Sequence, residues 1–298
     1  MPSTPSLVYT LSSNGKYYIV GTGFTSVEEI EADTSGGIIG SGLDSTWAGG
    51  SLIIPNEYNG KPVKAIAPKA FAAIYNITNV YIHDGLTHIG HRCFQCADIF
   101  DTAMISCRLP STLTSIGGTG GRILWGRQGL TVVSIPSNVD ILQTSTFAHC
   151  NALKAVNIYN IKELGSSCFQ GCSALTTLNA DNLVRVGNTS FYNCNGLTEL
   201  VLPSVETIGN NVFYGVTSLT KVTIGANCKN IDVAGLTCGS ETNKCTFVFE
   251  GRTPPVVASS TFNKNYLNKI IVPKGCGNTY KTATNWAAIA SYIEEATQ

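Results

Sequence analysis

The chain has 298 residues, of which 43% are apolar and only 13% are charged, and nineteen basic residues balance nineteen acidic ones. This length is ample to bury a core, and the apolar content excludes a disordered chain. The balanced charge argues against nucleic acid and anionic lipid as partners, because no net field draws the chain onto them. No apolar run reaches the roughly 18 residues of a membrane-spanning helix, so no such segment is expected.

The start of the chain carries no export signal. The first residues, MPSTPSLVYTLSSNGKYY, lack the basic and apolar regions of a signal peptide. Either the protein is not exported by that route, or a signal has been removed from it. The low charge and the abundance of Thr, Ser and Asn favour an extracellular location.

A β-hairpin is predicted near the N-terminus. Residues 7–21, LVYTLSSNGKYYIVG, contain two alternating runs separated by Asn14-Gly15. This dipeptide between alternating runs is a strong signal for a tight hairpin turn. We therefore interpret residues 1–50 as an N-terminal capping β-hairpin region.

The central part of the chain is built from repeats. Six copies are evident, at 52–74, 77–100, 130–152, 153–174, 175–196 and 197–218. The last three are 22 residues long and align without a gap. Residues 101–129 carry a degraded copy, ISCRLPSTLTSIG, and then a glycine-rich insertion at about 117–129. Copies after residue 219 lose a recurring Phe and degenerate towards residue 275. Such a period predicts a repeat protein.

Each copy reads as one coil. It opens with the pattern Leu-x-x-Val/Leu-x-apolar, which alternates with period two and predicts a short strand with one buried face. A glycine such as Gly165 marks a tight turn, and a Phe closes the coil. One coil cannot bury these side chains alone, whereas stacked coils bury them against each other. We expect a continuous structural spine made of Phe71, Phe94, Phe147, Phe169, Phe191 and Phe213.

The pattern L-x-x-V-x-I-P-x-x-V-x-x-I-G-x-x-x-F-x-x-C resembles the BspA-like leucine-rich repeat family of bacterial surface proteins. The resemblance covers about 50–275, and residues 272–295 resemble the closing helix of such proteins. It implies a repeat solenoid, α+β or mainly β: a right-handed coil with a stacked parallel sheet, an N-terminal β-hairpin cap and a C-terminal helix cap. We predict one elongated domain, with the solenoid at 51–275 and the capping helix at 276–298.

Eleven cysteines cannot all pair within one chain. Cys150, Cys172 and Cys194 recur three residues after a Phe, in a position that holds Val216 in the next copy. This predicts packing as small hydrophobic residues. Cys238 and Cys245 bracket the insertion GSETNK and are candidates for a surface disulfide. Cysteines outside these positions that fall near apolar slots are expected to be buried, namely Cys107, Cys228 and Cys276.

Three of the four histidines lie in one segment, HDGLTHIGHRCFQC at 83–96. A zinc site needs about four converging nitrogen or sulfur ligands. His88 and His91 flank the inward Ile89 and are expected to face out, whereas Cys93 faces in. The ligands would therefore diverge, and we predict neither a metal nor another cofactor.

No catalytic constellation stands out, so we predict no catalytic residues and no enzyme activity. The segment GGTGG at 117–121 lacks the Lys-Ser/Thr of a phosphate-binding loop. We interpret it as a flexible excursion that carries Trp125, with a binding loop as the alternative.

The outward positions of the predicted strands are the candidate binding surface. They are small and polar, with Tyr81 and Tyr159 as aromatic exceptions, and tyrosine is a good anchor in recognition. An ordinary soluble face is the alternative. The predicted binding residues are Tyr81, His83, Asn157, Tyr159, Asn179, Asp181, Glu199 and Lys221.

The function favoured by the repeat pattern and the resemblance is a non-catalytic binding or adhesion module. Its partner would be a protein or a glycan rather than nucleic acid, and its location would be the cell surface or the extracellular space. Two alternatives are a phage virion component for host recognition and the recognition domain of a larger enzyme.

Overall fold

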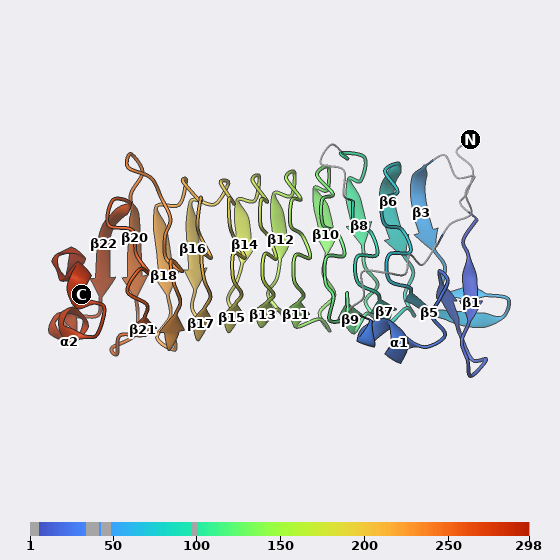
Figure 1. The fold of residues 1–298 in the computed structure, drawn as a ribbon, viewed down its shortest axis with the longest axis horizontal. Helices are drawn as coiled ribbons and strands as arrows, with labels where there is room; N and C mark the ends of the chain where they lie inside the picture. Colours follow the sequence, from blue (N-terminus) through green and yellow to red (C-terminus); the bar gives the residue numbers. More distant parts are fainter. Residues whose placement is uncertain (1–5, 34–41, 43–48, 97–100, 298) are drawn as a thin grey trace. The chain divides into compact units, whose positions relative to one another are not determined.

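A computed structural model describes residues 6–33, 42, 49–96 and 101–297 (Figure 1). The fold is a repeat solenoid of short parallel strands with few, short helices, as predicted from the repeats. The described residues belong to two compact units, Met1–Asn157 and Ile158–Gln298. The predicted boundaries of the caps, and the expectation of a single domain, stay predictions.

The first unit carries a parallel sheet of four strands in the order β10-β8-β6-β3. These strands are β3 (Gly50–Ile54), β6 (Ile77–Ile82), β8 (Ser106–Arg108) and β10 (Val132–Ser134). Leu52, Val80, Cys107 and Val133 lie side by side in register and are all buried. Alternation along each strand thus places one row of side chains in the core and the next in solvent.

A second sheet of the first unit has the order β1-β2-β5-β7-β9. It contains β1 (Tyr9–Leu11), β2 (Tyr18–Val20), β5 (Lys61–Ile66), β7 (His88–Ile89) and β9 (Ser115–Ile116), and β4 (Glu57–Tyr58) pairs with β5. Two further strands of this unit are β11 (Ile141–Leu142) and β12 (Ala155–Asn157).

The predicted N-terminal hairpin is confirmed. Strands β1 and β2 are antiparallel, with Tyr9 opposite Val20. Gly15 has a φ of +68°, which glycine adopts easily in a tight turn. Strand β2 in turn pairs with β5 in parallel, so the hairpin extends the second sheet.

The repeat pattern does not predict helix α1 (Val27–Ala32), which contacts β7. Ser26 caps its N-terminus by accepting a hydrogen bond from the amide of Glu29 at 3.2 Å. The Glu29 carboxylate reaches back to the amide of Thr25 at 2.7 Å. This reciprocal arrangement satisfies amides that would otherwise lack partners at the helix start.

The second unit also carries two parallel sheets. One has the order β16-β18-β20-β22-β23, with β16 (Glu199–Leu202), β18 (Lys221–Ile224), β20 (Cys245–Phe249), β22 (Leu267–Val272) and β23 (Ile293–Glu295). The other includes β13 (Glu163–Leu164), β15 (Arg185–Val186), β17 (Thr207–Ile208), β19 (Asn230–Ile231) and β21 (Val256–Val257). Strand β14 (Thr177–Asn179) also belongs to this unit.

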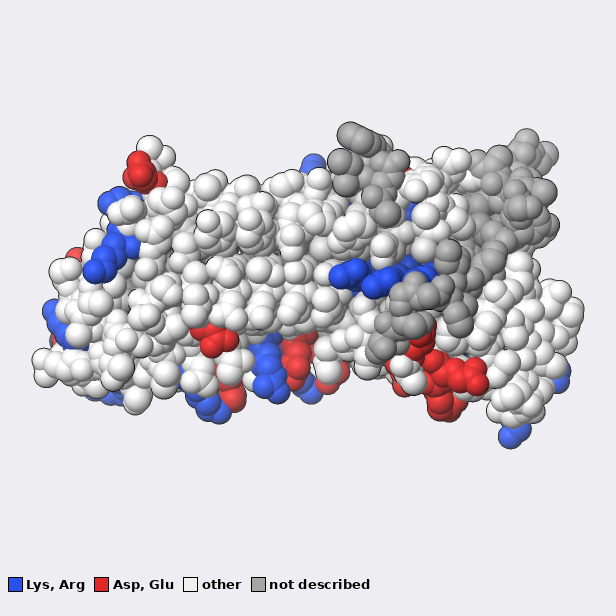
Figure 2. All heavy atoms as spheres, in the orientation of Figure 1, with Lys and Arg blue, Asp and Glu red and all other residues white. Residues whose placement is uncertain are grey.

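Ion pairs connect neighbouring coils along the β13–β21 sheet. Arg185 donates to Glu163 at 3.1 Å and Lys229 donates to Glu206 at 2.6 Å. Figure 2 shows charged side chains gathered along this side of the second unit, and others towards its C-terminal end. Because these pairs are exposed, each stabilises the fold by no more than about 1 kcal/mol.

The six predicted phenylalanines are core residues, and Leu124 holds the equivalent position between Phe94 and Phe147. All six predicted phenylalanines are buried, with no exposed surface. The rings of Phe71 and Phe94 stack at 5.3 Å, and Phe191 lies 5.8 Å from both Phe169 and Phe213. Where Phe is missing after residue 219, Leu236 is buried in its place and donates its amide to the carbonyl of Thr261.

The glycine-rich insertion is not a flexible excursion, so that prediction is wrong. Amides of Arg122, Leu124 and Gly126 donate to the carbonyls of Thr144, Thr146 and Ala148 in the next coil. Leu124 is buried and takes the place of the phenylalanine. The segment at 117–129 is therefore part of a regular coil, whose register the extra glycines conceal in the sequence.

The C-terminal segment is not one helix, which corrects the predicted helix at 276–298. It forms α2 (Gly277–Thr282), a 3₁₀ helix η1 (Ala287–Tyr292) and then β23. The chain turns extended at Ala283, and Asn285 has a φ of +67°, so a continuous helix cannot form. Trp286 is nevertheless buried, and its ring nitrogen donates to the carbonyl of Pro255 at 2.9 Å.

Candidate binding face

The outward side chains of the first sheet form one surface, which we call the first-unit face. Its central residues are Tyr81 of β6, Arg108 of β8 and Ser134 of β10, which lie side by side in register. Beside them run Asn79, Ser106 and Val132, in the same strands and the same register. Ser106 donates to Asn79 at 2.8 Å. The face is thus polar, with one cation and one tyrosine at its centre.

Arg108 and Tyr81 hold each other in place. The guanidinium carbon lies 4.6 Å from the centre of the Tyr81 ring, and Nη1 donates to the Tyr81 hydroxyl. The other side of Tyr81 meets His83 edge to face, with ring centres 4.7 Å apart. A cation over an aromatic face gains about 0.5–1 kcal/mol at an exposed site. The cluster therefore presents a positive group in a fixed position.

Asp84 lies close to this cluster but is engaged elsewhere. Its Oδ1 accepts hydrogen bonds from the amide and the hydroxyl of Ser111, at 2.7 and 2.9 Å. These bonds, and then the nearby charges of Arg108 and His83, lower the pKa of Asp84. The carboxylate is thus ionised and held by Ser111.

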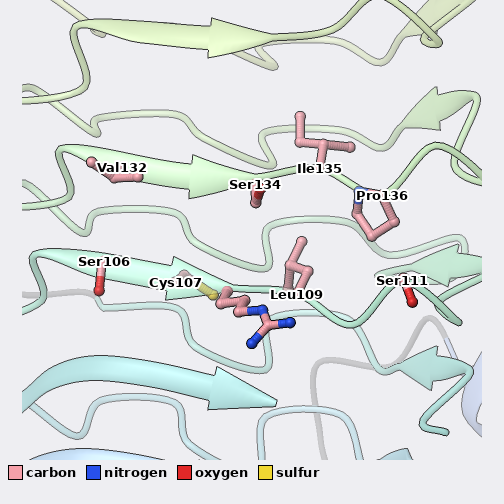
Figure 3. A pocket seen from close by; sticks show the side chains of 9 residues that line it. Ser106, Cys107, Leu109, Ser111, Val132, Ser134, Ile135 and Pro136 are labelled. Atoms are coloured by element: carbon pink, nitrogen blue, oxygen red, sulfur yellow. The ribbon is translucent and has the colours of Figure 1, made fainter. Parts of the chain in front are cut away.

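A hollow of about 430 Å³ lies beside Arg108, between β8 and β10 (Figure 3). Val132, which is 61% exposed, forms part of its wall. The rest of the wall combines three apolar residues with three serines: Leu109, Ile135, Pro136, Ser106, Ser111 and Ser134. The first-unit face therefore combines an apolar depression with a fixed cation.

The second unit has a comparable hollow of about 410 Å³. It is lined by the predicted residues Asn179, Asp181 and Glu199. Glu199 lies opposite Lys221 in the register of β16 and β18. In contrast to the first hollow, this one carries two carboxylates.

The predicted binding residues thus fall into groups. Tyr81 and His83 are in contact within the first unit, where Asn157 is also exposed at the end of β12. Asn179, Asp181, Glu199 and Lys221 lie together in the second unit, where Tyr159 is 50% exposed. That these residues bind a partner stays a prediction.

Sequence reasoning missed Arg108. The copy at 101–129 looked degraded, so its outward residues were not placed beside those of the other coils. The alternation in Ser106-Cys107-Arg108-Leu109 was the available signal, because Cys107 and Leu109 are buried and Ser106 and Arg108 are not.

The prediction that His91 faces solvent is wrong. Its side chain is 1% exposed, and its Nε2 lies 2.9 Å from a carboxylate oxygen of Asp33. His88 lies 3.4 Å from Glu31. The cause is helix α1, which ends beside β7 and brings both acids to these histidines. Across the described parts of the chain, no three His, Cys, Asp or Glu side chains are placed to hold a metal ion.

All eleven cysteines are buried thiols. The predicted packing position is confirmed for Cys150, Cys172 and Cys194, which have no exposed surface. They are more than small hydrophobic residues, because Cys150 donates to the carbonyl of Leu124 at 3.2 Å and Cys194 to that of Phe169 at 3.0 Å. Burial raises the pKa of both these thiols to about 12.

Cys238 and Cys245 are free thiols in the structure, so a disulfide between them stays a prediction. Burial raises the pKa of Cys238 well above its ordinary value, and a hydrogen bond with Cys245 raises it further. The two sulfur atoms are thus neighbours, as the insertion between them suggested.

Counting labelled thiols tests both the burial of the cysteines and the pairing of Cys238 with Cys245. At pH 8 we expect a maleimide to label native protein very slowly, because buried thiols with raised pKa values form little thiolate. After denaturation without reductant, eleven labels are expected if all thiols are free, and nine if Cys238 and Cys245 have paired. Intact-mass spectrometry gives the count. Rapid labelling of the native protein would contradict the packed position of the sulfur atoms.

Stacked parallel coils with a recurring Phe spine define a leucine-rich repeat protein. The chain belongs to the BspA type leucine-rich repeat family, whose model matches residues 51–119 and 124–237 in six copies, more than half of the chain. No curated protein matches the chain.

One solved structure supports the fold. A leucine-rich cell surface protein from Faecalibacterium prausnitzii A2-165 is 15% identical, with a TM-score of 0.54, and the match covers 100% of this chain and 97% of that one. The T. pallidum leucine-rich repeat protein is 17% identical, with a TM-score of 0.45, and covers 76% of this chain and 81% of that one. At 15% identity, the likeness to the F. prausnitzii protein shows the fold alone.

Proposed function

We propose that the protein is a non-catalytic binding module whose first-unit face docks a protein partner. The observation that carries this proposal is the cluster of Tyr81, Arg108 and His83 beside an open hollow. Tyr and Arg are enriched among the residues that dominate binding energy in protein interfaces. Extended surfaces of repeat proteins suit large partners.

The composition of the face favours a protein over a glycan. Ile53 is 48% exposed and Val132 is 61% exposed, on either side of the Tyr81–Arg108 pair in the sheet. Covering such apolar groups with the apolar side chains of another protein is favourable, because it removes their surface from water. Because the Tyr81 ring is already held in place, it loses little conformational entropy when a partner binds.

We place this activity at the cell surface or outside the cell. The family resemblance supports that location, and so does the description of the F. prausnitzii protein as a cell surface protein. In the described ranges, no helix is both long and apolar enough to cross a membrane. Host matrix proteins and proteins of other cells are the partners that the family suggests.

The test is biolayer interferometry with the purified protein, against a panel of purified matrix proteins and a glycan array. For any protein captured, Tyr81→Ala should weaken binding at least tenfold without lowering the melting temperature. The variant Tyr159→Ala tests the second unit in the same way. Tyr75→Ala is the matched control, because Tyr75 is 44% exposed but is not among the outward strand residues of the face. Unchanged binding by the Tyr81 variant would exclude this face, and capture of glycans alone would exclude a protein partner.

A further inference from the structure

We propose that Arg108 and the hollow beside it recognise an acidic side chain next to an apolar side chain on the protein partner. This inference rests on the proposed function, and names the chemistry that the first-unit face selects. It is carried by the unused donors of Arg108, by its fixed position and by the wall of the hollow.

Most hydrogen-bond donors of the Arg108 side chain are unused. A guanidinium carries five N–H donors, and the only hydrogen bond of the Arg108 side chain to the described residues goes to the hydroxyl of Tyr81. No carboxylate in the described part of the chain forms an ion pair with it, and the neighbouring Asp84 is held by Ser111 instead. The other donors therefore remain for a ligand, and the planar group matches a carboxylate with two parallel hydrogen bonds.

The position of Arg108 is prepared in advance. Stacking on the Tyr81 ring and the bond to its hydroxyl restrict the long side chain, and His83 in turn packs against Tyr81. A guanidinium that is already placed loses less conformational entropy when it binds an anion. This arrangement distinguishes Arg108 from an ordinary exposed arginine, which moves freely in solvent.

The hollow supplies the second half of the specificity. Its volume of about 430 Å³ has room for an apolar side chain, which would contact Val132, Ile135 and Pro136. A basic side chain there would be repelled by Arg108, and a uniformly polar ligand would leave the apolar wall without a matching partner. An acidic residue beside Leu, Val or Phe fits both parts.

The hollow of the second unit has the opposite charge. Its wall contains Asp181 and Glu199 and no Lys or Arg, so it would repel an acidic segment. The two hollows resemble each other in size but oppose each other in charge, and acidic selectivity is therefore expected at the first-unit face alone.

The experiment uses the full chain and a peptide array, so that no natural ligand has to be known. The probes are twelve-residue Gly/Ser peptides that carry Asp-Leu, Glu-Val or Asp-Phe, each with matched versions in which Asn, Gln or Lys replaces the acid. Wild-type protein should retain the acidic peptides at least tenfold more strongly than the amide versions. Raising the salt from 50 to 300 mM should weaken that retention, because salt screens exposed charges.

Variants assign the selectivity to residues. Arg108→Gln should abolish the preference for acid over amide. Arg108→Lys should keep part of that preference, because it retains the positive charge but cannot make two parallel hydrogen bonds to a carboxylate. Val132→Ser should reduce the dependence on the apolar residue and leave the preference for acid. Arg122→Gln is the control, because Arg122 is an exposed arginine of the first unit that does not line the hollow.

The outcomes separate this inference from the proposed function. If wild-type protein holds amide and acidic peptides equally, or if Arg108→Gln changes nothing, carboxylate recognition is wrong. The binding role survives that result if Tyr81→Ala still weakens capture of a protein partner. If there is neither a preference for acidic peptides nor an effect of Tyr81→Ala on protein capture, the proposed function itself is wrong. Retention of sulfated glycans in place of acidic peptides would show that the partner is not a protein.

Discussion

Arg127→Met is expected to lower the free energy of unfolding by about 3–5 kcal/mol, because it leaves a buried carboxylate without its partner. Arg127 has no exposed surface, and its Nη1 lies 2.6 Å from Asp101, whose side chain is 2% exposed. The same guanidinium also donates to the carbonyls of Phe94 and Ile74, at 2.6 and 2.9 Å. The variant thus removes the only charged partner of Asp101 in the described part of the chain, together with hydrogen bonds to the backbone carbonyls of Phe94, Ile74 and Phe71.

The measurement is urea unfolding followed by circular dichroism. Arg122→Met is the matched control: this arginine is exposed in the same coil, and its replacement should change the free energy by no more than about 0.5 kcal/mol. The double variant Arg127→Met with Asp101→Leu should recover part of the loss, since no unpaired charge remains. Equal effects of the two single arginine variants would show that the buried pair does not stabilise the fold.

Phe191→Ala is expected to cost about 3–5 kcal/mol, the usual range for removing a buried aromatic ring. Phe191 stacks between Phe169 and Phe213, so truncation leaves a cavity with a ring on each side. Cys172→Ala and Cys194→Ala should cost much less, about 1 kcal/mol each, because each removes only a small thiol group, whose hydrogen bonds are weak.

Melting temperatures of the three variants provide the comparison, and Cys194→Val adds a control. Valine already occupies the equivalent position at Val216, so it should be accepted there. A cysteine variant as unstable as Phe191→Ala would refute a packing role for the sulfur atoms. A small effect of Phe191→Ala would likewise show that the spine does not support the coils.

The coil architecture could be predicted because its signals are local and repeated. Phenylalanines that recur every 22 residues from Phe147 to Phe213 set the register of these coils, and Asn14-Gly15 between two alternating runs specifies a turn. The first-unit face was only partly predictable: Tyr81 and His83 followed from strand alternation, whereas Arg108 lies in a coil whose register the glycines disguise.

Other features depend on contacts between distant segments. Helix α1 has six residues and a single buried side chain, Ile30, so it leaves no periodic pattern. The burial of His91 follows from that helix and could not be foreseen without it. Arg127 occupies the position that cysteine holds in later coils, and a charge there is tolerable only because Asp101 lies beside it.

The contacts of Arg127 bear on how such a gene can change in length. Most coils are joined by backbone bonds and ring stacking that any neighbouring copy can provide, so recombination that adds or deletes a 22-residue unit such as 175–196 keeps the stack intact. Arg127 instead bonds to Phe94 and Ile74 in earlier coils and to Asp101 at the start of its own. Its coil and the ones before it must therefore be inherited together and in order. Variation in repeat number among relatives is expected to fall after residue 152 and to spare the segment from 52 to 129.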